Sequence, residues 1–503
     1  MTTTDEPTTT AAGAGATFDS LDPATGEVVG THPIHDADAV REAVAEARRQ
    51  AVWWEGLGFA GRKKQLALWR SLIARRIDDL AAVMSAETGK PHGDAVLEIV
   101  LGVDHLNWAA GHAGKVLGRR SVSPGLLMVN QAASVAYRPL GVIGVIGPWN
   151  YPVFTPLGSI AYALAAGNAV VFKPSEFTPG VGQWLADTFL EAVGRPVLQT
   201  VTGYGETGAA LCSAGVDKVA FTGSTATGKK VMAACAETLT PVVIEAGGKD
   251  ALLVDDDADL GEAADAAVWG ACGNAGQTCA GVERVYVHER VYDDFLTEIV
   301  TRAESVKAGP GEQVGPITMP GQLDIIRRHI DDALARGGRA LVGGADAVGD
   351  RYVQPTVLVD VPEDSAAMQE ETFGPTVTVT KVRDMDEAVK LANGTRYALG
   401  STVFSAKRGA EIAEKLRAGM TAINGVITFA GIPTLPFGGV GDSGFGRIHG
   451  ADGLREFTYA HAVARQRFKP ALALTTFQRT AKAEKQLSTM IGALYGRAGR
   501  DKS

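Results

Sequence analysis

Apolar residues recur at helical spacing in the first part of the chain. Between Asp36 and Trp54 they occupy one face, with Asp36 or Asp38 as the N-cap: Val40, Ala43, Val44, Ala47, Ala51 and Val52. The same periodicity predicts one or two helices over 60–88, ending near Gly89, and another over 94–113. This region is therefore predicted to be a helical layer.

From residue 141 onward, short apolar runs of strand length alternate with helical segments. The first series has strands at 141–146, 169–172, 197–202, 218–221 and 241–244, separated by helices at 160–166, 181–193, 206–212 and 226–236. The second has strands at 251–254, 283–287, 376–380, 401–404 and 420–424, with helices at 260–272, 291–305, 320–336, 385–393 and 409–417. Such alternation predicts an α/β fold whose parallel sheets are covered on both faces.

Two segments break this alternation. Residues 127–138 alternate in part and predict a strand pair that projects from the main body, while 454–468 predicts a short helix followed by a strand. The tail from Lys469 to Ser503 carries a net charge of about +5, with apolar residues at helical spacing (Leu487, Met490, Ile491, Leu494). We expect a frayed or locally packed terminal helix there, with a membrane-surface helix as the alternative.

Composition and charge exclude several classes of protein. The 503 residues carry a net charge of −9, which argues against nonspecific nucleic-acid binding. No apolar run is long enough for an integral membrane segment, and residues 1–17 lack the features of a signal peptide and predict a disordered tail. The four cysteines form no C-x-x-C pair, so we expect reduced thiols, no metal site and a cytoplasmic protein.

The most informative stretch is C-G-N-A-G-Q-T-C-A-G at 272–281, which surrounds Cys279 with small residues. Small residues let backbone N–H groups approach a reacting centre. Glu245 lies upstream in E-A-G-G-K, and a thiol with a separate carboxylate can form and then hydrolyse a thioester. A single cysteine is more often a packing residue, so other motifs must decide.

Two other stretches are candidates for nucleotide binding. F-T-G-S-T-A-T-G at 221–228 follows a strand and opens a helix, so Ser224 and the helix amides can face a pyrophosphate, although an ordinary capped turn has the same pattern. Lys173 and Glu176 end another strand and could hold a ribose, or form a surface ion pair. We discount G-x-G-x-x-G at 203–208, because no acidic residue closes a following strand.

Seven motifs in order resemble those of the NAD(P)-dependent aldehyde dehydrogenase superfamily over about residues 20–468: P-W-N-Y-P at 148–152, K-P-S-E at 173–176, F-T-G-S at 221–224, E-A-G-G-K at 245–249, G-Q-T-C at 276–279, E-T-F-G-P at 371–375 and P-F-G-G at 436–439. The resemblance implies an aldehyde dehydrogenase-like fold of the bacterial, non-phosphorylating, hydrolytic type. It would have a Rossmann-variant cofactor domain (18–120 and 142–246), a catalytic domain (247–445), a small β oligomerisation element (121–141 and 446–468) and a basic tail (469–503). It also implies a homodimer or homotetramer.

The resemblance assigns catalytic roles to three residues. Cys279 would attack the aldehyde, and the Asn150 amide with the Cys279 backbone N–H would form the oxyanion hole. Hydride would pass to the nicotinamide, and Glu245 would activate the water that hydrolyses the thioester.

The resemblance also assigns the cofactor site. Lys173 and Glu176 would hold the adenosine ribose, Ser224 the pyrophosphate and Glu371 the nicotinamide ribose, with Phe373 beside it; Trp149 and Gly223 complete the set. The Glu176 carboxylate accepts hydrogen bonds from a ribose 2′-OH but repels a 2′-phosphate. NAD is therefore the expected cofactor, with NADP possible.

The substrate is less well specified. Tyr151, Thr278 and Phe437 are candidates for the pocket, and Ala246 replaces the usual leucine after the glutamate. Many relatives that bind a substrate carboxylate carry arginine eight residues after the oxyanion-hole asparagine, where this chain has Gly158. We therefore expect an uncharged aliphatic or aromatic aldehyde, with succinic semialdehyde as the alternative.

Three other activities are weaker candidates. A CoA-acylating dehydrogenase is disfavoured because the base Glu245 would hydrolyse the thioester. A cysteine hydrolase would need a histidine base, which none of the motifs contains. A catalytically silent homologue would be expected to lose Cys279, Glu245 or Asn150, and all three are present.

Overall fold

The computed structural model describes residues 15–470, 472 and 476–496, in two compact units. The first unit comprises the residues up to Leu117 together with Arg138–Tyr459, and the second comprises Gly118–Tyr137 with the residues from Ala460 onward. Most of the predicted disordered tail lies outside the described residues. Thr17, its last residue, already begins strand β1 (Thr17–Leu21).

The predicted helical layer is confirmed as α1 (Ala37–Gly56), α2 (Gly58–Arg75), α3 (Ile77–Thr88) and α4 (His92–Leu117). Asp36 caps α1 by accepting a hydrogen bond from the Ala39 N–H at 2.9 Å. Gly89 ends α3 with a φ of 69°, the left-handed conformation that glycine adopts without penalty. A hairpin of β1 and β2 (Val28–Pro33) precedes α1 and was not predicted, because β2 is mostly exposed and lacks an apolar face.

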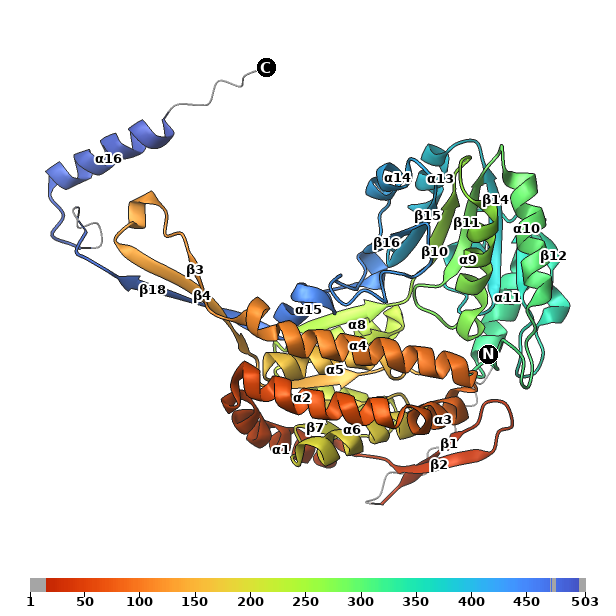
Figure 1. Cartoon of the computed structure of the whole chain (residues 1–503), viewed down its shortest axis with the longest axis horizontal. Helices are drawn as coiled ribbons and strands as arrows, with labels where there is room; N and C mark the ends of the chain where they lie inside the picture. The colour runs from red at the N-terminus through yellow and green to blue at the C-terminus, as the bar shows by residue number, and fades with distance from the viewer. Residues whose placement is uncertain (1–14, 471, 473–475, 497–503) are drawn as a thin grey trace. The chain divides into compact units, whose positions relative to one another are not determined.

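A six-stranded sheet carries the first α/β series (Figure 1). Its order is β17-β9-β8-β5-β6-β7, formed by β5 (Val142–Ile146), β6 (Ala169–Lys173), β7 (Leu198–Thr200), β8 (Lys218–Gly223), β9 (Val242–Ala246) and the antiparallel β17 (Gly444–Phe445). The connecting helices are α5 (Phe154–Ala166), α6 (Pro179–Val193), α7 (Gly205–Ser213) and α8 (Thr225–Ala236). Because β5 to β9 are parallel, their carboxyl ends share one edge of the sheet.

A seven-stranded sheet carries the second series, in the order β12-β13-β14-β11-β10-β15-β16. Its strands are β10 (Asp250–Val254), β11 (Val282–His288), β12 (Arg339–Val342), β13 (Thr356–Val359), β14 (Thr376–Val382), β15 (Gly400–Phe404) and β16 (Met420–Ile423). The associated helices are α9 (Leu260–Cys272), α10 (Tyr292–Ser305), α11 (Gln322–Ala335), α12 (Ala366–Gln369), α13 (Met385–Ala392) and α14 (Gly409–Lys415). Strands β12 and β13 were not predicted, because they are short and lie in an irregular segment.

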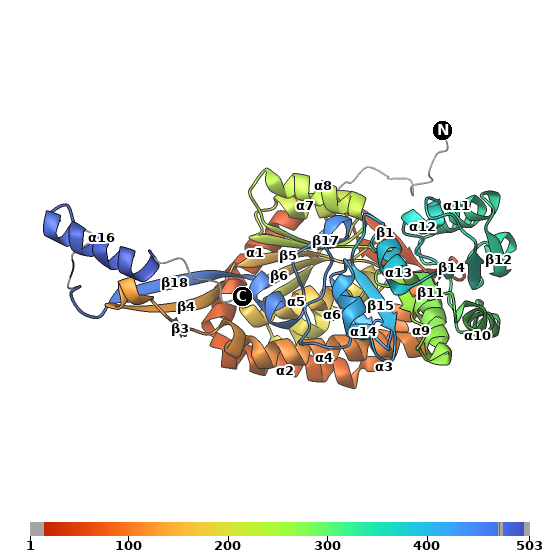
Figure 2. The same ribbon diagram turned by 90° about the horizontal axis from the view of Figure 1, so that it is seen from above.

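Alternate residues of β10 explain why this sheet is covered on both faces. Leu252 and Val254 pack in one apolar cluster with α9 and α10, and Ala251 and Leu253 pack in another with α13 and α14. Figure 2 shows α9 and α10 together on one side of β11 and β14. The apolar run of β10 is therefore a strand buried on both faces, as its sequence predicts.

The second unit contains most of a three-stranded sheet ordered β18-β4-β3, with β3 (Arg120–Val122), β4 (Gln131–Pro139) and β18 (Thr458–Gln466). The predicted strand pair within 127–138 is wrong, because this segment supplies only one strand, β4. Residues 126–128 form a 3-10 turn after Gly125, whose φ is 73°, and β4 pairs with the earlier β3 instead. The helix α15 (Gly450–Glu456) belongs to the first unit, so the second unit resumes later than the predicted residue 446.

The tail contains the predicted helix, α16 (Ala481–Tyr495). None of its side chains is fully buried, although Leu487, Met490 and Ile491 are partly so, and the expectation of a frayed or locally packed helix stays open. Among the residues that the structure describes, no helix combines the length and the apolar character needed to cross a membrane.

Candidate active site

One cavity of about 740 Å³ lies at the carboxyl ends of the six-stranded sheet, in the first unit. It brings together all ten residues predicted to act in catalysis or cofactor binding: Cys279, Glu245, Asn150, Trp149, Lys173, Glu176, Gly223, Ser224, Glu371 and Phe373. They come from the ends of β5, β6, β8 and β9 and from two loops of the second α/β series. The motifs are therefore distant in sequence but adjacent in space, as expected for the carboxyl edge of a parallel sheet.

The loop before Cys279 has an uncommon backbone. Asn274, Ala275 and Gly276 have φ values of 54°, 57° and 71°, three successive residues in the left-handed region. A side chain at Gly276 would collide with the backbone of Gly374, so the two loops touch backbone to backbone. A left-handed backbone conformation costs residues other than glycine of the order of 1–2 kcal/mol each. The strained residues Asn274 and Ala275 therefore lie in the loop that carries the thiol.

Hydrogen bonds hold the Asn150 side chain against this loop. Its Nδ2 donates to the Gln277 carbonyl at 2.9 Å, which uses one of the two amide hydrogens. Its backbone carbonyl accepts from Asn274 Nδ2 at 3.0 Å and from Lys90 Nζ at 2.9 Å. The second amide hydrogen of Asn150 is therefore the one that can reach a substrate.

Lys90 and Glu98 support Asn150 from the helical layer. The two side chains form an ion pair and are almost fully buried. Glu98 Oε1 also accepts the N–H groups of Val153 and Phe154, at 2.8 and 3.1 Å, at the start of α5. We did not predict either residue, because in sequence they are ordinary polar positions at the start of an amphipathic helix.

Buried carboxyl groups surround the thiol. Both oxygens of Glu245 and Oε1 of Glu371 lack a hydrogen-bond partner within the described part of the chain. Burial raises the pKa of Glu245 to about 7 and that of Glu371 to about 8. Burial also raises the pKa of the Cys279 thiol, and the carboxylates of Glu245, Asp250 and Glu371 raise it further. The thiol and Glu245 therefore both favour their protonated forms.

The far part of the cavity has the features of a nucleotide site. Lys173 Nζ lies 3.4 Å from Glu176 Oε2 at the end of β6. Burial lowers the pKa of Lys173, and Glu176 partly offsets the effect. Ser224 caps α8 by accepting from the Thr227 N–H at 3.2 Å, so the first turn of this helix borders the cavity.

These residues fit a nicotinamide dinucleotide. The unpartnered Oε1 of Glu371 is a buried acceptor, Glu176 is a second acceptor, and the amides at the start of α8 suit a pyrophosphate. A side chain at Gly247 would collide with the Glu371 carboxylate, so the glycine lets this acceptor approach β9. Gly205 and Gly208, from the motif that we discounted, also line the cavity, as does Lys230, which we did not consider.

Comparison with known proteins identifies the family. A model described as the aldehyde dehydrogenase family matches residues 10–463, almost the whole chain. The chain belongs to this family. The prediction of an NAD(P)-dependent aldehyde dehydrogenase with the fold of that family is thereby confirmed.

Several relatives share most of their length with this dehydrogenase. A 4,4'-diapolycopene aldehyde oxidase from a Methylomonas species is 38% identical over 450 residues, which cover 88% of this chain and 84% of that protein. The crystal structure of an NAD-dependent aldehyde dehydrogenase from Sinorhizobium meliloti has a TM-score of 0.87 at 34% identity, covering 93% and 95% of the two chains. The structure of an E. coli NADP dependent enzyme has a TM-score of 0.85 at 33% identity, covering 90% and 95%.

The predicted substrate residues of this dehydrogenase lie on another side of Cys279. Tyr151, Thr278 and Phe437 do not line the large cavity. Instead, the Tyr151 hydroxyl is 2.9 Å from Thr278 Oγ1. Phe437 belongs to an apolar cluster with Phe154, Ala280 and Phe429, against which Tyr151 and Cys279 pack. The thiol therefore borders the large cavity on one side and packs on the other against this cluster, whose phenylalanines Phe154, Phe429 and Phe437 we call the aromatic wall.

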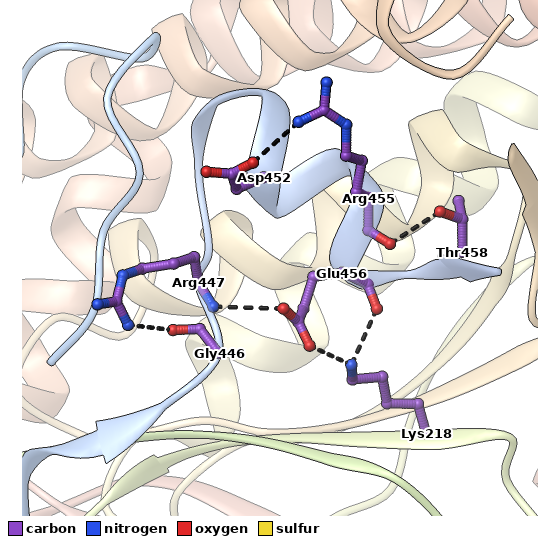
Figure 3. Close-up of a pocket in the computed structure, with 7 residues that line it drawn as sticks. All are labelled: Lys218, Gly446, Arg447, Asp452, Arg455, Glu456 and Thr458. Carbon is purple, nitrogen blue, oxygen red and sulfur yellow. Dashed lines mark hydrogen bonds and ion pairs between the residues drawn. The ribbon is translucent and has the colours of Figure 1, made fainter. Parts of the chain in front are cut away.

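A second cavity of about 540 Å³ lies near the end of α15 (Figure 3). Lys218 forms an ion pair with Glu456 and also donates to the Glu456 carbonyl at 2.9 Å. Arg455 donates to Asp452 at 3.0 Å, and Arg447 donates to the Gly446 carbonyl at 2.6 Å. Because its charged groups already bind one another or backbone carbonyls, this cavity is a weaker candidate for a ligand site than the first.

Proposed function

We propose that this dehydrogenase oxidises an uncharged aldehyde to the carboxylic acid with NAD, through a covalent adduct on Cys279. One observation carries the proposal: a thiol, a buried carboxyl without a partner and an amide N–H converge beside a cavity suited to a dinucleotide. Nucleophile, base and oxyanion donor are the three groups that this chemistry needs.

The first step forms the adduct. Burial raises the pKa of Glu245 to about 7, and hydrogen bonding from the Cys279 thiol acts against this rise, so the Glu245 carboxylate can take the thiol proton near neutral pH. The thiolate then attacks the carbonyl carbon and forms a C–S bond, and the carbonyl electron pair moves to oxygen. The second N–H of Asn150 and the backbone N–H of Cys279 stabilise this oxyanion.

The second step is oxidation, for which a bound nicotinamide supplies a two-electron acceptor. Glu371 and Phe373 would hold one end of the cofactor, and Lys173, Glu176 and Ser224 the other. The Glu176 carboxylate favours a ribose 2′-OH over a 2′-phosphate, which supports NAD. Lys230 on the same cavity is a cation that could accept a phosphate, so NADP is the alternative.

The third step releases the acid. After oxidation the Cys279 adduct is a thioester. Glu245 takes a proton from water, the hydroxide oxygen bonds to the carbonyl carbon, and the C–S bond breaks to return the thiolate. A carboxyl with a pKa of about 7 is suited to accept and lose protons in both half-reactions. Hydrolysis at this base is the reason for preferring the acid, rather than a CoA ester, as product.

The substrate that fits this site best is apolar. The aromatic wall of Phe154, Phe429 and Phe437 presents no charge to the thiol side, and Gly158 supplies no cation. The name of the Methylomonas relative refers to a polyene aldehyde, which supports an apolar substrate class. Succinic semialdehyde is the second candidate. Its carboxylate would need a cation that lies outside the aromatic wall.

We further propose a cytoplasmic homodimer or homotetramer. The sheet of the second unit ends in β18 and β3, and an edge strand can pair with a copy of the chain. The mass of the purified protein in solution tests this part.

NADH formation across an aldehyde panel tests the activity. The panel contains a medium-chain alkanal, an aromatic aldehyde, betaine aldehyde and succinic semialdehyde, each with NAD and with NADP. Cys279→Ala should abolish turnover while retaining NAD binding. Cys272→Ala, which alters a buried cysteine outside the cavity, is the matched control and should remain active. Turnover by Cys279→Ala would refute the nucleophile.

A further inference from the structure

The cofactor loop, which we define as residues 371–373, is held by its middle residue, Thr372. Thr372 is buried and does not line the large cavity, whereas its two neighbours do. Its carbonyl accepts a hydrogen bond from Gln322 Nε2 at 2.7 Å. Its hydroxyl accepts one from Lys249 Nζ at 3.0 Å. The position of this loop therefore depends on side chains that lie outside it.

The Glu283 carboxylate binds the backbone of the same loop. Its Oε1 accepts the N–H groups of Thr372 and Phe373, at 3.1 and 3.0 Å. Its Oε2 accepts the N–H of Thr372 at 2.9 Å. Phe373 has a φ of 52°, in the left-handed region that residues other than glycine seldom adopt. One carboxylate therefore holds a strained turn at the edge of the cavity.

Lys249 and Glu283 also form an ion pair, and both side chains are buried. Burial raises the pKa of Glu283, but the Lys249 ammonium and the loop N–H groups outweigh it and lower the pKa below its ordinary value. Glu283 is therefore ionised, and an ionised acceptor makes stronger hydrogen bonds than a neutral one. Because desolvation offsets much of the attraction in a buried ion pair, we attribute to this pair the geometry of the loop rather than a large gain in stability.

The same pair connects the cofactor loop to the reacting groups. Lys249 ends E-A-G-G-K, the segment that begins with the proposed base. Within this segment, a side chain at Gly247 would collide with the Glu371 carboxylate. A Cβ at Gly248 would lie 2.9 Å from the Cys279 carbonyl oxygen. The segment therefore packs against both the cofactor loop and the residue that carries the thiol.

We propose that Lys249 and Glu283 are positioning residues that set the nicotinamide end of the cofactor against the thiol by fixing the cofactor loop. The inference rests on the proposed function, because it presumes that Glu371 and Phe373 hold that end of the cofactor. It goes beyond that function by naming the residues that determine where this end lies. Neither Lys249 nor Glu283 lines the cavity, so both act through the loop. Their loss should therefore affect the nicotinamide end and spare the adenosine end.

Calorimetric titration compares the two ends without turnover. The ligands are NAD and ADP, which has the adenosine and the pyrophosphate but lacks the nicotinamide and its ribose. In Glu283→Gln an NH2 group replaces one acceptor oxygen and repels either the Lys249 ammonium or the loop N–H groups. We expect the Kd of NAD to rise by about tenfold, the loss of one hydrogen bond of about 1.4 kcal/mol, while the Kd of ADP changes by less than about twofold. An unchanged ratio of the two Kd values would overturn the proposal.

Two further variants separate positioning from stability. Lys249→Met combined with Glu283→Gln removes the unpaired charge and keeps one oxygen for the loop N–H groups, so it should bind NAD more tightly than Glu283→Gln alone. Binding no tighter than in the single variant would contradict the role of the oxygen. Thr372→Val, which removes only the hydroxyl that Lys249 binds, carries the test if Glu283→Gln does not fold. It should raise the Kd of NAD by about threefold but not that of ADP, and equal changes would overturn the proposal.

Asp255→Asn is the matched control. Asp255 is a buried carboxylate paired with Arg408, it follows the opposite end of β10, and it lies outside the cavity. This variant should lose stability but keep the wild-type ratio of Kd values. With an aldehyde deuterated at C1, Glu283→Gln should show a slower burst of NADH and a larger isotope effect than Asp255→Asn. Wild-type protein that binds NAD but oxidises no aldehyde would refute the proposed function, and the comparison of NAD with ADP would still decide the role of Glu283.

Discussion

Replacing Glu245 by glutamine should change how stability depends on pH. The carboxyl is buried with neither oxygen hydrogen-bonded to a described residue, and its pKa is about 7 instead of the ordinary 4.5. One pKa unit corresponds to about 1.4 kcal/mol, so the folded protein disfavours the ionised form by about 3 kcal/mol. The pKa of Glu245 is higher in the folded than in the unfolded protein, so folding is most favourable while Glu245 is neutral. This contribution to the free energy of unfolding is fully present below about pH 4.5 and is lost as the pH rises through about 7.

Glu245→Gln removes this loss because glutamine does not ionise. Relative to the wild type, the free energy of unfolding of the variant should therefore rise by about 3 kcal/mol between about pH 4.5 and pH 8. Urea unfolding followed by tryptophan fluorescence, at fixed protein concentration, measures this difference. Glu191→Gln is the control, since that glutamate forms an exposed ion pair with Arg76, and surface pairs contribute only about 0–1 kcal/mol.

An equal stability difference between variant and wild type at both pH values would refute the reasoning, because it would mean that Glu245 titrates normally in the folded protein. The same variant separates the two half-reactions. Because Glu245 is proposed to act in both, Glu245→Gln should slow the burst of NADH formation as well as steady-state turnover. A burst of one equivalent at the wild-type rate, followed by arrest, would confine Glu245 to hydrolysis.

Four further predictions concern the residues that hold the catalytic loop and the cofactor, and the pH dependence of hydrolysis. Gly276→Ala should reduce kcat by more than about tenfold, measured by NADH formation, because a Cβ there collides with the Gly374 backbone. Lys90→Met leaves Glu98 buried without its partner and should destabilise the protein by about 3–5 kcal/mol, measured by urea unfolding; an unchanged midpoint would contradict the buried pair. Glu176→Gln should raise kcat/KM with NADP relative to NAD by about tenfold, since it removes a charge that repels the 2′-phosphate. In the wild type, the hydrolytic step should accelerate as the pH rises through about 7, because only ionised Glu245 accepts a proton.

The sequence predicts those parts of the structure that depend on local pattern. The runs at 142–146 and 251–254 are recognisable as strands, because burial on both faces favours residues that are all apolar or small. The residues at their carboxyl ends could be assigned to one site because parallel strands bring those ends together. The motifs of Cys279 and Glu245 supply a nucleophile and a base to that edge. The residues predicted from these motifs line one cavity.

The rest depends on contacts that no local pattern records. Lys90, in the short link before α4, and Glu98, within α4, are ordinary polar residues in sequence; only in the fold does Lys90 pair with Glu98 and donate to the Asn150 carbonyl. His449 lies in a glycine-rich segment, and only the structure reveals its positive φ and its contact with Gly158. The prediction of a strand pair within 127–138 was also wrong. The exposed apolar residues 126–129 have the composition of a strand, but they follow Pro124 and Gly125 in a turn.

The contact between Gly276 and Gly374 limits how this enzyme can diverge. The backbone of Gly276 lies against that of Gly374, so a side chain at position 276 cannot be accommodated unless the loop that carries Glu371 moves. Point mutations can hardly adjust the separation of the two loops in small steps, because most either leave it unchanged or disrupt the loops. New substrates must therefore be accommodated by changing the aromatic wall. Directed evolution of this dehydrogenase should accordingly accumulate beneficial substitutions around Phe154, Phe429 and Phe437, and almost none in 274–276.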